Sequence, residues 1–145
     1  MNKIPHIVCL LITLFLTACG NSSNEEIPSV STSFLKKHFA NASVVETQKT
    51  LDFDYEVTLD NGVDITFERR GNWEEINARK NDISAVFEQI LPYNLFTYVK
   101  TNYPDKKIRK VERKKYGYLV TLNKPESIKL EFNKSGSFIS KRADD

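Results

Sequence analysis

The feature that most constrains the fold is an internal repeat. Three pairs of segments align without gaps: IPSVSTSFLKKHFANASVV (27–45) with LPYNLFTYVKTNYPDKKIR (91–109), YEVTL (55–59) with YLVTL (118–122), and ITFERRGNW (65–73) with LEFNKSGSF (130–138). Self-similarity at a nearly constant spacing is typical of one supersecondary unit used more than once. The chain is therefore expected to fold as two tandem repeats, residues 27–80 and 83–142, within one domain at 27–145.

Each copy begins with a helical pattern. Before and after Pro92, apolar residues of the second copy recur at three- and four-residue spacing: Ile83, Val86, Phe87, Ile90 and Leu91, then Leu95, Phe96, Tyr98 and Val99. Because proline breaks a helix but is tolerated in a first turn, the pattern predicts two short helices that meet at Pro92. In the first copy we expect a shorter helix, whose cap is one of the hydroxyl residues Ser31, Thr32 and Ser33.

Strands follow the helical pattern in both copies. Tyr55, Val57 and Leu59 alternate with polar residues, and the same alternation resumes after the turn DNG, which predicts a hairpin with one apolar face. The expected strands are 43–51, 55–59, 63–67 and 73–79 in the first copy and 108–115, 118–122, 128–132 and 137–142 in the second. An apolar sheet face needs a cover, which the preceding helix can provide. The predicted fold is α+β, with two tandem units that each pack a helix on an antiparallel sheet of three to four strands. The two sheets are expected either to form one continuous sheet or to pack edge to edge.

The start of the chain has the pattern of an export signal. An apolar run from Ile7 to Leu16 follows Lys3 and is interrupted only by Thr13. It has about the length of a signal-peptide hydrophobic region and is shorter than the ~20 residues that span a bilayer. Residues 1–18 are therefore predicted to be a signal peptide.

The run ends in Leu16-Thr17-Ala18-Cys19, which resembles a bacterial lipobox. This resemblance implies lipidation of Cys19 as the first residue of the mature chain and attachment to a membrane, with 19–26 as a flexible polar tether. The alternative is cleavage without lipidation. Gly20 after the cysteine favours the outer membrane, and the periplasmic and surface faces both stay open. Because Cys9 lies in the signal, the mature chain has no second cysteine for an internal disulfide.

Charge is balanced overall but divided along the chain. The sequence has 21 Lys and Arg against 19 Asp and Glu, which argues against a nucleic-acid binder. Residues 20–94 carry 7 basic and 13 acidic side chains, whereas residues 95–145 carry 13 and 6. The densest basic stretch, 105–115, contains Lys107, Arg109 and Arg113. It could bind an acidic partner or form the solvated face of a strand.

No catalytic or metal-binding constellation stands out. His38 is the only histidine after the signal and lies near the end of the expected first helix, where the helix dipole favours it. Glu74-Glu75 and the trio Asp52, Asp54 and Glu56 could be paired carboxylates or a calcium site, but strand alternation also predicts the trio on a solvated face. The sequence has no phosphate-binding loop and no nucleophile elbow. We therefore expect no enzyme activity, no bound metal and no cofactor.

The repeated pattern of aromatic helix ends (HFA and NYP), YEVTLDNGVDITFERRGNW and its second copy resembles the PepSY-like, β-lactamase-inhibitor-like domain of bacterial secreted lipoproteins. The resemblance covers the chain from about residue 27 to residue 142. It implies an α+β fold of tandem units in the cell envelope and a binding or inhibitory role. The first copy departs from the pattern at Ala40, where the second has Pro104.

Three functions are consistent with these features. The first is a lipid-anchored envelope protein that binds or inhibits another protein through an exposed sheet face. The second is a carrier or sensor of a small ligand or divalent cation that uses the acidic half, and the third is a self-associating structural lipoprotein that forms a homo-oligomer. Trp73 and Phe138 follow turn glycines at matching places and could be structural anchors or binding residues. The candidate binding surface comprises Trp73, Phe138, Lys107, Arg109 and Arg113.

Overall fold

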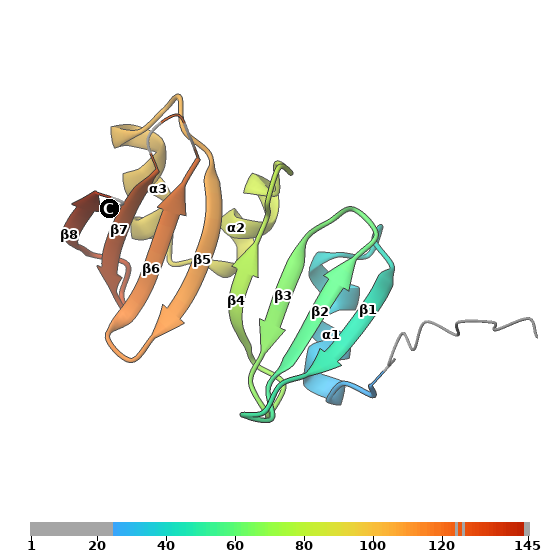
Figure 1. The fold of residues 1–145 in the computed structure, drawn as a ribbon. Helices are drawn as coiled ribbons and strands as arrows, with labels where there is room; N and C mark the ends of the chain where they lie inside the picture. Colours follow the sequence, from blue (N-terminus) through green and yellow to red (C-terminus); the bar gives the residue numbers. More distant parts are fainter. Residues whose placement is uncertain (1–24, 124, 126, 144–145) are drawn as a thin grey trace, which may run out of the picture.

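The computed structural model describes residues 25–123, 125 and 127–143. In chain order the elements are α1 (Ser29–His38), β1 (Val44–Lys49), β2 (Tyr55–Leu59), β3 (Asp64–Phe67), β4 (Trp73–Asn77), α2 (Ser84–Ile90), α3 (Tyr93–Asn102), β5 (Ile108–Lys114), β6 (Gly117–Leu122), β7 (Ile128–Asn133) and β8 (Phe138–Ala143). The expected signal peptide and Cys19 lie outside the described residues. The described residues form an α+β fold, as predicted (Figure 1).

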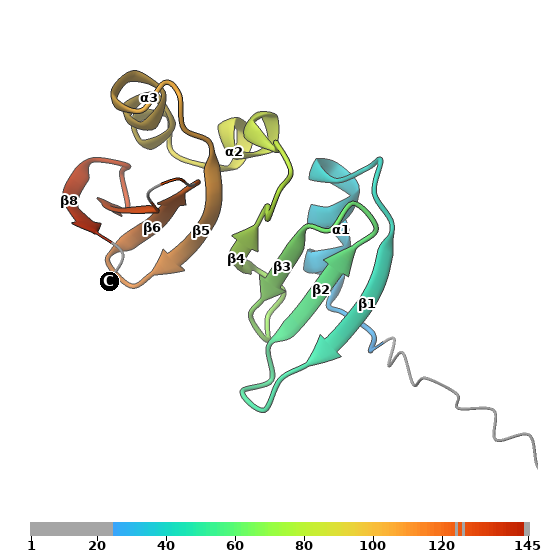
Figure 2. The same cartoon turned by 45° about the horizontal axis from the view of Figure 1, so that its top comes forward.

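The strands form one antiparallel sheet whose eight members follow each other in chain order, from β1 at one edge to β8 at the other. The three helices of the described residues all lie on the same side of this sheet (Figures 1 and 2). The core lies between the helices and the sheet, and its largest fully buried side chains are Phe67, Phe87 and Phe132. The opposite side of the sheet has no helix from the described part of the chain over it.

The two units join through strands β4 and β5. Three residue pairs are in register across this seam, with Ile76 opposite Val111 at its centre, and both of these side chains are fully buried. The backbone N–H of Ala78 also donates to the carbonyl of Arg109 at 2.7 Å. Of the two arrangements that the sequence leaves open, the continuous sheet is therefore the one that forms.

The repeat is visible in the packing of the aromatic side chains. The ring of Phe34 meets the edge of Phe67 with centroids 5.8 Å apart and planes at 79°, and Tyr98 meets Phe132 at 5.5 Å and 79°. Each unit therefore places a ring of its helix over a ring of its third strand. This geometry confirms the alignment of the two copies.

Two turn glycines also occupy equivalent places. Gly71 and Gly136 have φ values of 91° and 83°, in the region that favours glycine. A Cβ on Gly71 would come within 2.8 Å of the Pro28 side chain, and a Cβ on Gly136 within 2.7 Å of the Pro92 side chain. In each unit a turn of the sheet therefore packs directly against the first turn of the helix.

The start of α1 differs from the prediction. The helix begins at Ser29 after Pro28, has no side-chain cap, and is 10 residues long, the same as α3. The expected hydroxyl cap is wrong because the proline, with φ of −54°, already sets the entry into the helix. The first copy has the shorter helical part, as expected, since the second copy has α2 in addition to α3. Ser31 is instead fully buried, and its Oγ donates to the carbonyl oxygen of Gly71 at 3.0 Å.

The expected break at Pro92 is confirmed. Helix α2 ends at Ile90 and α3 starts at Tyr93, and Leu91 between them has an extended backbone with ψ of 154°. The residue before a proline is disfavoured in the helical region, which explains why the chain turns at Leu91. The two helices that result cover the sheet from the seam to the second unit (Figure 1).

Candidate binding face

The side of the sheet away from the helices forms a polar surface, which we call the open face. Strand alternation and the observed register place two rows of side chains on it, and each row crosses all eight strands. The first row is Gln48, Glu56, Thr66, Glu75, Glu112, Leu119, Glu131 and Ser140, and the second is Glu46, Thr58, Asp64, Asn77, Lys110, Thr121, Lys129 and Arg142. The open face is therefore rich in acidic groups in the first unit and carries its basic groups in the second.

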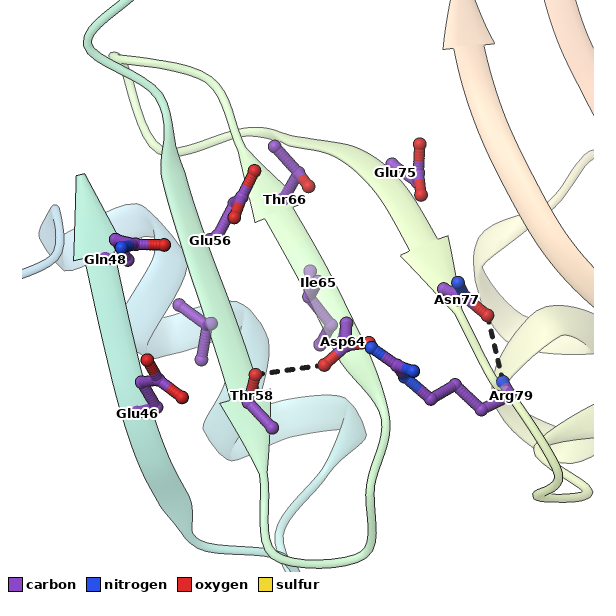
Figure 3. A pocket seen from close by; sticks show the side chains of 11 residues that line it. Glu46, Gln48, Glu56, Thr58, Asp64, Ile65, Thr66, Glu75, Asn77 and Arg79 are labelled. Carbon is purple, nitrogen blue, oxygen red and sulfur yellow. Dashed lines mark hydrogen bonds and ion pairs between the residues drawn. The ribbon is translucent and has the colours of Figure 1, made fainter. Parts of the chain in front are cut away.

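The part of the open face in the first unit is hollowed and acidic. The hollow has a volume of about 360 Å³, and we call it the acidic hollow because four carboxylates line it: Glu46, Glu56, Asp64 and Glu75 (Figure 3). Asp64 accepts a hydrogen bond from the Thr58 hydroxyl at 2.9 Å and forms an ion pair with Arg79. Within the described residues, Glu46 and Glu56 have no ion-pair partner, so their charge is available to a ligand.

A chain of ion pairs crosses the seam on this face. Lys110 of β5 lies 3.3 Å from a carboxylate oxygen of Glu75 in β4 and 3.3 Å from one of Glu112 in its own strand. Lys114 pairs with Glu112 at 2.9 Å. Burial by itself raises the pKa of Glu112, but the hydrogen bonds and charges of the two lysines outweigh it and hold this pKa below its usual range. The network links the acidic unit to the basic unit.

Glu131 is the centre of the second unit's part of the open face. Its carboxylate accepts hydrogen bonds from the Ser140 hydroxyl and, at 3.1 Å, from the Tyr116 hydroxyl, and it pairs with Arg142 at 2.6 Å. These contacts lower the pKa of Glu131, with the Ser140 hydrogen bond as the largest cause. A carboxylate with three such partners has its charge satisfied within the protein, in contrast to Glu46 and Glu56.

The acidic residues considered as a calcium site do not share one strand face. Strand β1 ends at Lys49, and Phe53 in the following turn has φ of 67°, so Asp52 lies in the turn and not in β2. Nearby, Glu74 occupies the extra position of a β-bulge between β3 and β4. Burial raises the pKa of Glu74, and the negative charges of Asp54, Glu68 and Glu75 raise it further. Among the described residues, no group of three or more His, Cys, Asp or Glu side chains is placed to hold a metal ion.

His38 lies at the end of the first helix, as expected. It is the last residue of α1, its ring centroid is 4.8 Å from that of Phe34, and its Nδ1 is 3.2 Å from the side-chain oxygen of Gln89. The ring therefore packs within its helix and contacts α2 through one nitrogen. It has the surroundings of a structural histidine.

The aromatic pair singled out in the sequence packs beneath the helices. Trp73 lies beside Phe34 with ring centroids 6.5 Å apart, and Phe138 stacks on Tyr98 at 4.7 Å with planes 8° apart. Arg113 packs against Trp73. Its guanidinium carbon is 5.3 Å from the centroid of the indole ring, and its Nη1 donates a hydrogen bond to the Trp73 carbonyl oxygen at 3.2 Å. Trp73 and Arg113 thus form one local cluster, and Phe138 occupies the equivalent place in the second unit.

The other two residues of the candidate surface lie elsewhere. Lys107 precedes β5 and pairs with Asp82 at 2.7 Å, and Arg109 borders a hollow with Asn61 and Gly62 at the opposite end of β5 from Arg113. The five candidates therefore do not converge on one surface. The sequence singled out Glu56 and Glu75 of the acidic hollow, but Glu46 and Asp64 were missed because strand alternation alone marks them only as solvated. The convergence of these carboxylates depends on four neighbouring strands, β1 to β4.

Comparison with solved structures supports the fold. A candidate periplasmic protein of unknown function from Bacteroides vulgatus is 27% identical with a TM-score of 0.70, and the match covers 81% of this chain and 92% of that one. A protein from Bacteroides thetaiotaomicron, described as a candidate calcium-regulated periplasmic protein, is 32% identical with a TM-score of 0.69 over 81% of this chain and 91% of that one. A second candidate periplasmic protein from Bacteroides vulgatus is 32% identical with a TM-score of 0.65, over 80% and 90% of the two chains.

Sequence comparison identifies the family. No curated protein matches the chain significantly. None of the helices in the described residues has the length and apolar character needed to cross a membrane. The model of the family described as "Putative beta-lactamase-inhibitor-like, PepSY-like" matches at residues 22–69 and again at 53–140, which together span both units. The chain therefore belongs to this PepSY-like family, whose solved neighbours are described as periplasmic proteins.

Proposed function

We propose that this protein is a lipid-anchored, non-catalytic module of the cell envelope that binds another protein through its open face. The observation that carries the proposal is the one-sided sheet: in the part of the chain that the structure describes, three helices lie behind eight strands and leave a charged, hollowed surface in front (Figures 1 and 3). The lipobox at Leu16–Cys19 supports the anchor. The periplasmic neighbours support the compartment.

The charges of the open face indicate what kind of partner fits. Glu46 and Glu56 lie in adjacent strands of the acidic hollow, and within the described part of the chain no basic side chain neutralises them. A partner with a basic protrusion would be attracted to this hollow by electrostatic steering. The fit of the protrusion in the hollow would also fix the position at which the partner docks. Because the first unit carries most of the open face's acidic charge, we expect the partner to lie mainly over β1–β4.

The absence of catalysis is part of the same proposal. His38 contacts Gln89 and not a hydroxyl or carboxylate group of the described residues. The carboxylates of the open face lie on a broad polar surface, whereas catalytic carboxylates are commonly found in clefts that exclude water. These features support a binding role.

The test uses the lipidated full-length protein in its native membranes. Chemical cross-linking and affinity recovery are followed by mass spectrometry for three proteins: the wild type, the double variant Glu46→Lys/Glu56→Lys, and the control Glu88→Lys, which changes an exposed carboxylate on α2. We expect one envelope protein in stoichiometric amount with the wild type and the control, and at least a tenfold loss with the double variant. Equal recovery by all three proteins would contradict the use of the open face. Recovery of the protein alone would favour self-association.

The anchor is tested separately. Replacement of Cys19 by alanine is expected to abolish incorporation of radiolabelled palmitate, because the cysteine sulfur is the proposed acceptor of the lipid. Asn21→Ala, two residues along the same tether, should label normally. Palmitate incorporation that persists in the Cys19→Ala variant would refute the anchor without affecting the binding proposal.

A divalent-cation sensor is the second candidate. The observations that favour it are the description of one relative as a candidate calcium-regulated protein and the surroundings of Glu74, where burial and then neighbouring negative charges raise the pKa of its carboxyl group. A cation near Asp54 and Glu68 would relieve this repulsion. Isothermal titration with CaCl₂ should then show heat that is reduced in the Asp54→Asn variant. Titration without heat and without a thermal shift would eliminate this candidate.

A further inference from the structure

One end of the molecule, which we call the turn end, gathers four turns of the sheet and the first turns of two helices. The turns are 50–54, 68–72, 114–117 and 133–137, and the helices are α1 and α3 (Figures 1 and 2). We propose that the turn end rests on a phospholipid bilayer, so that the sheet stands on the membrane and its open face points sideways. The proposal rests on the anchor at Cys19 and adds an orientation to it.

Exposed apolar side chains are concentrated at this end. The described residues have nine large hydrophobic side chains that are exposed, and five of them lie at the turn end: Val30, Leu51, Phe53, Tyr93 and Tyr116. Leu51 is 99% exposed and Tyr93 is 81% exposed. Single exposed apolar residues are ordinary, but a group of them at one end marks a surface that something covers. The other four are in the edge strands β1 and β8.

The hairpin between β1 and β2 holds its apolar tip outward. Phe53 adopts a left-handed backbone with φ of 67°, which is unfavourable for an aromatic residue. Thr50 stabilises it, since its carbonyl accepts from the Phe53 N–H at 3.1 Å and its hydroxyl accepts from the Asp54 N–H at 3.1 Å. These two hydrogen bonds hold the backbone of the tip in a defined conformation. The side chains of Leu51 and Phe53 therefore do not fold back onto the core.

Cations flank the exposed ring. The Nζ of Lys49 lies 5.6 Å from the ring centroid of Phe53, and the guanidinium carbon of Arg69 lies 5.5 Å from it. An aromatic side chain between basic groups matches the membrane interface, where rings lie at the level of the headgroups and cations meet phosphates. Asp52 and Asp54 in the same hairpin reduce the net charge, so we expect the apolar side chains to contribute more to membrane contact than the charges do.

The point at which the chain enters the fold also indicates that the turn end faces the membrane. Pro28, at the entry of α1, lies against the turn that contains Gly71, so the chain enters the fold at the turn end. Cys19 and Glu25 are six residues apart in the sequence. A segment of this length spans at most about 20 Å when fully extended, at roughly 3.3–3.6 Å per residue. A lipid on Cys19 would thus keep the turn end close to the bilayer.

The first experiment measures orientation on the lipidated protein. Two variants, Leu51→Cys at the turn end and Asn61→Cys at the opposite end of β2, are labelled with an environment-sensitive fluorophore and reconstituted into vesicles of phosphatidylethanolamine and phosphatidylglycerol. We expect a blue shift and quenching by spin-labelled lipid at position 51 and neither effect at position 61. Equal, water-like signals at both positions would overturn the proposal. Flotation of the same vesicles shows whether the anchor itself holds.

The second experiment does not depend on the anchor. The mature chain from Gly20 onward, which keeps all the described residues, is titrated with the same vesicles. Replacing Leu51 and Phe53 by serine should weaken partitioning on the order of tenfold or more, since burial of each side chain is worth about 1.5–3 kcal/mol when complete. Val45→Ser, a change at a side chain that is 51% exposed on β1, should leave partitioning unchanged. The same loss in both variants, or in neither, would refute the turn end as the contact, whatever the outcome for Cys19.

Discussion

Replacing Phe67 by alanine is expected to destabilise the whole protein in a single step. The Phe67 side chain is fully buried between the sheet and α1, and its ring meets Phe34 with centroids 5.8 Å apart. Truncation of a buried phenylalanine costs about 3–5 kcal/mol, because transfer free energy is lost and a cavity remains. For a domain of this size, an unfolding entropy near 2.1 cal/mol/K per residue converts that loss to a fall in Tm of roughly 12–20 °C.

The equivalent change in the second unit, Phe132→Ala, tests whether the two units unfold together. Phe132 is also fully buried and belongs to the same core cluster as Phe67. Because the two units share one sheet and one core, Phe132→Ala should lower the same transition by a similar amount. Thermal and urea unfolding, followed by far-ultraviolet circular dichroism and by the fluorescence of the single tryptophan, should give coincident curves for both variants.

The control is Thr66→Ala, next to Phe67 on the open face, which should change the free energy of unfolding by less than about 0.5 kcal/mol. Two separate transitions in either phenylalanine variant would show that the seam does not couple the units. A loss below about 1 kcal/mol would show that the core relaxes around the cavity. Either result would refute the reasoning.

Three further predictions concern stability and ionisation. Gly117→Ala should destabilise strongly, by more than about 3 kcal/mol in chemical denaturation, because φ is 151° and the new Cβ would come within 2.1 Å of a backbone oxygen of β7. Ser31→Ala should cost about 1–3 kcal/mol by the same assay, because it leaves the buried carbonyl of Gly71 without its hydroxyl donor. Hydrogen bonds from Lys107 and then from a neighbouring serine lower the pKa of Asp82 to about 2, so Lys107→Ala should raise it toward 3.8 in a carbon-detected NMR titration. Because the folded pKa is the lower one, the stabilisation from this carboxylate is present above pH 3.8 and is lost as the pH falls through 2; an unchanged titration midpoint in the variant would disprove the pairing.

Local sequence signals predicted most of the fold. The alternation in YEVTL and YLVTL corresponds to strands β2 and β6, and the proline at position 92 separates two helices as expected. These features are predictable because a strand or a helix break depends on residues close together in the chain. The start of α1 was predicted less well, since Ser31 has the chemistry of a cap but donates its hydrogen bond to a turn 40 residues away.

The candidate site was harder to predict. The sequence marked Trp73 and Phe138 by their matching places after turn glycines, and the structure shows that both pack against helix residues. It did not mark Glu46 and Glu56 as neighbours, because their approach depends on the register between β1 and β2. A one-residue shift of that register would move one of the two strands' side chains to the opposite side of the sheet.

By itself, the sequence determined that the chain contains one α+β unit twice, with glycine turns and one apolar face per sheet, because periodicity and turn chemistry are local properties. Only the tertiary structure decided that β4 pairs with β5, since the free energy of that seam comes from contacts such as Ile76 with Val111, 35 positions apart. The same pairing brings Lys110 between Glu75 and Glu112 and sets the acidic unit beside the basic one. The open face is therefore a product of long-range strand pairing, which no short stretch of residues specifies.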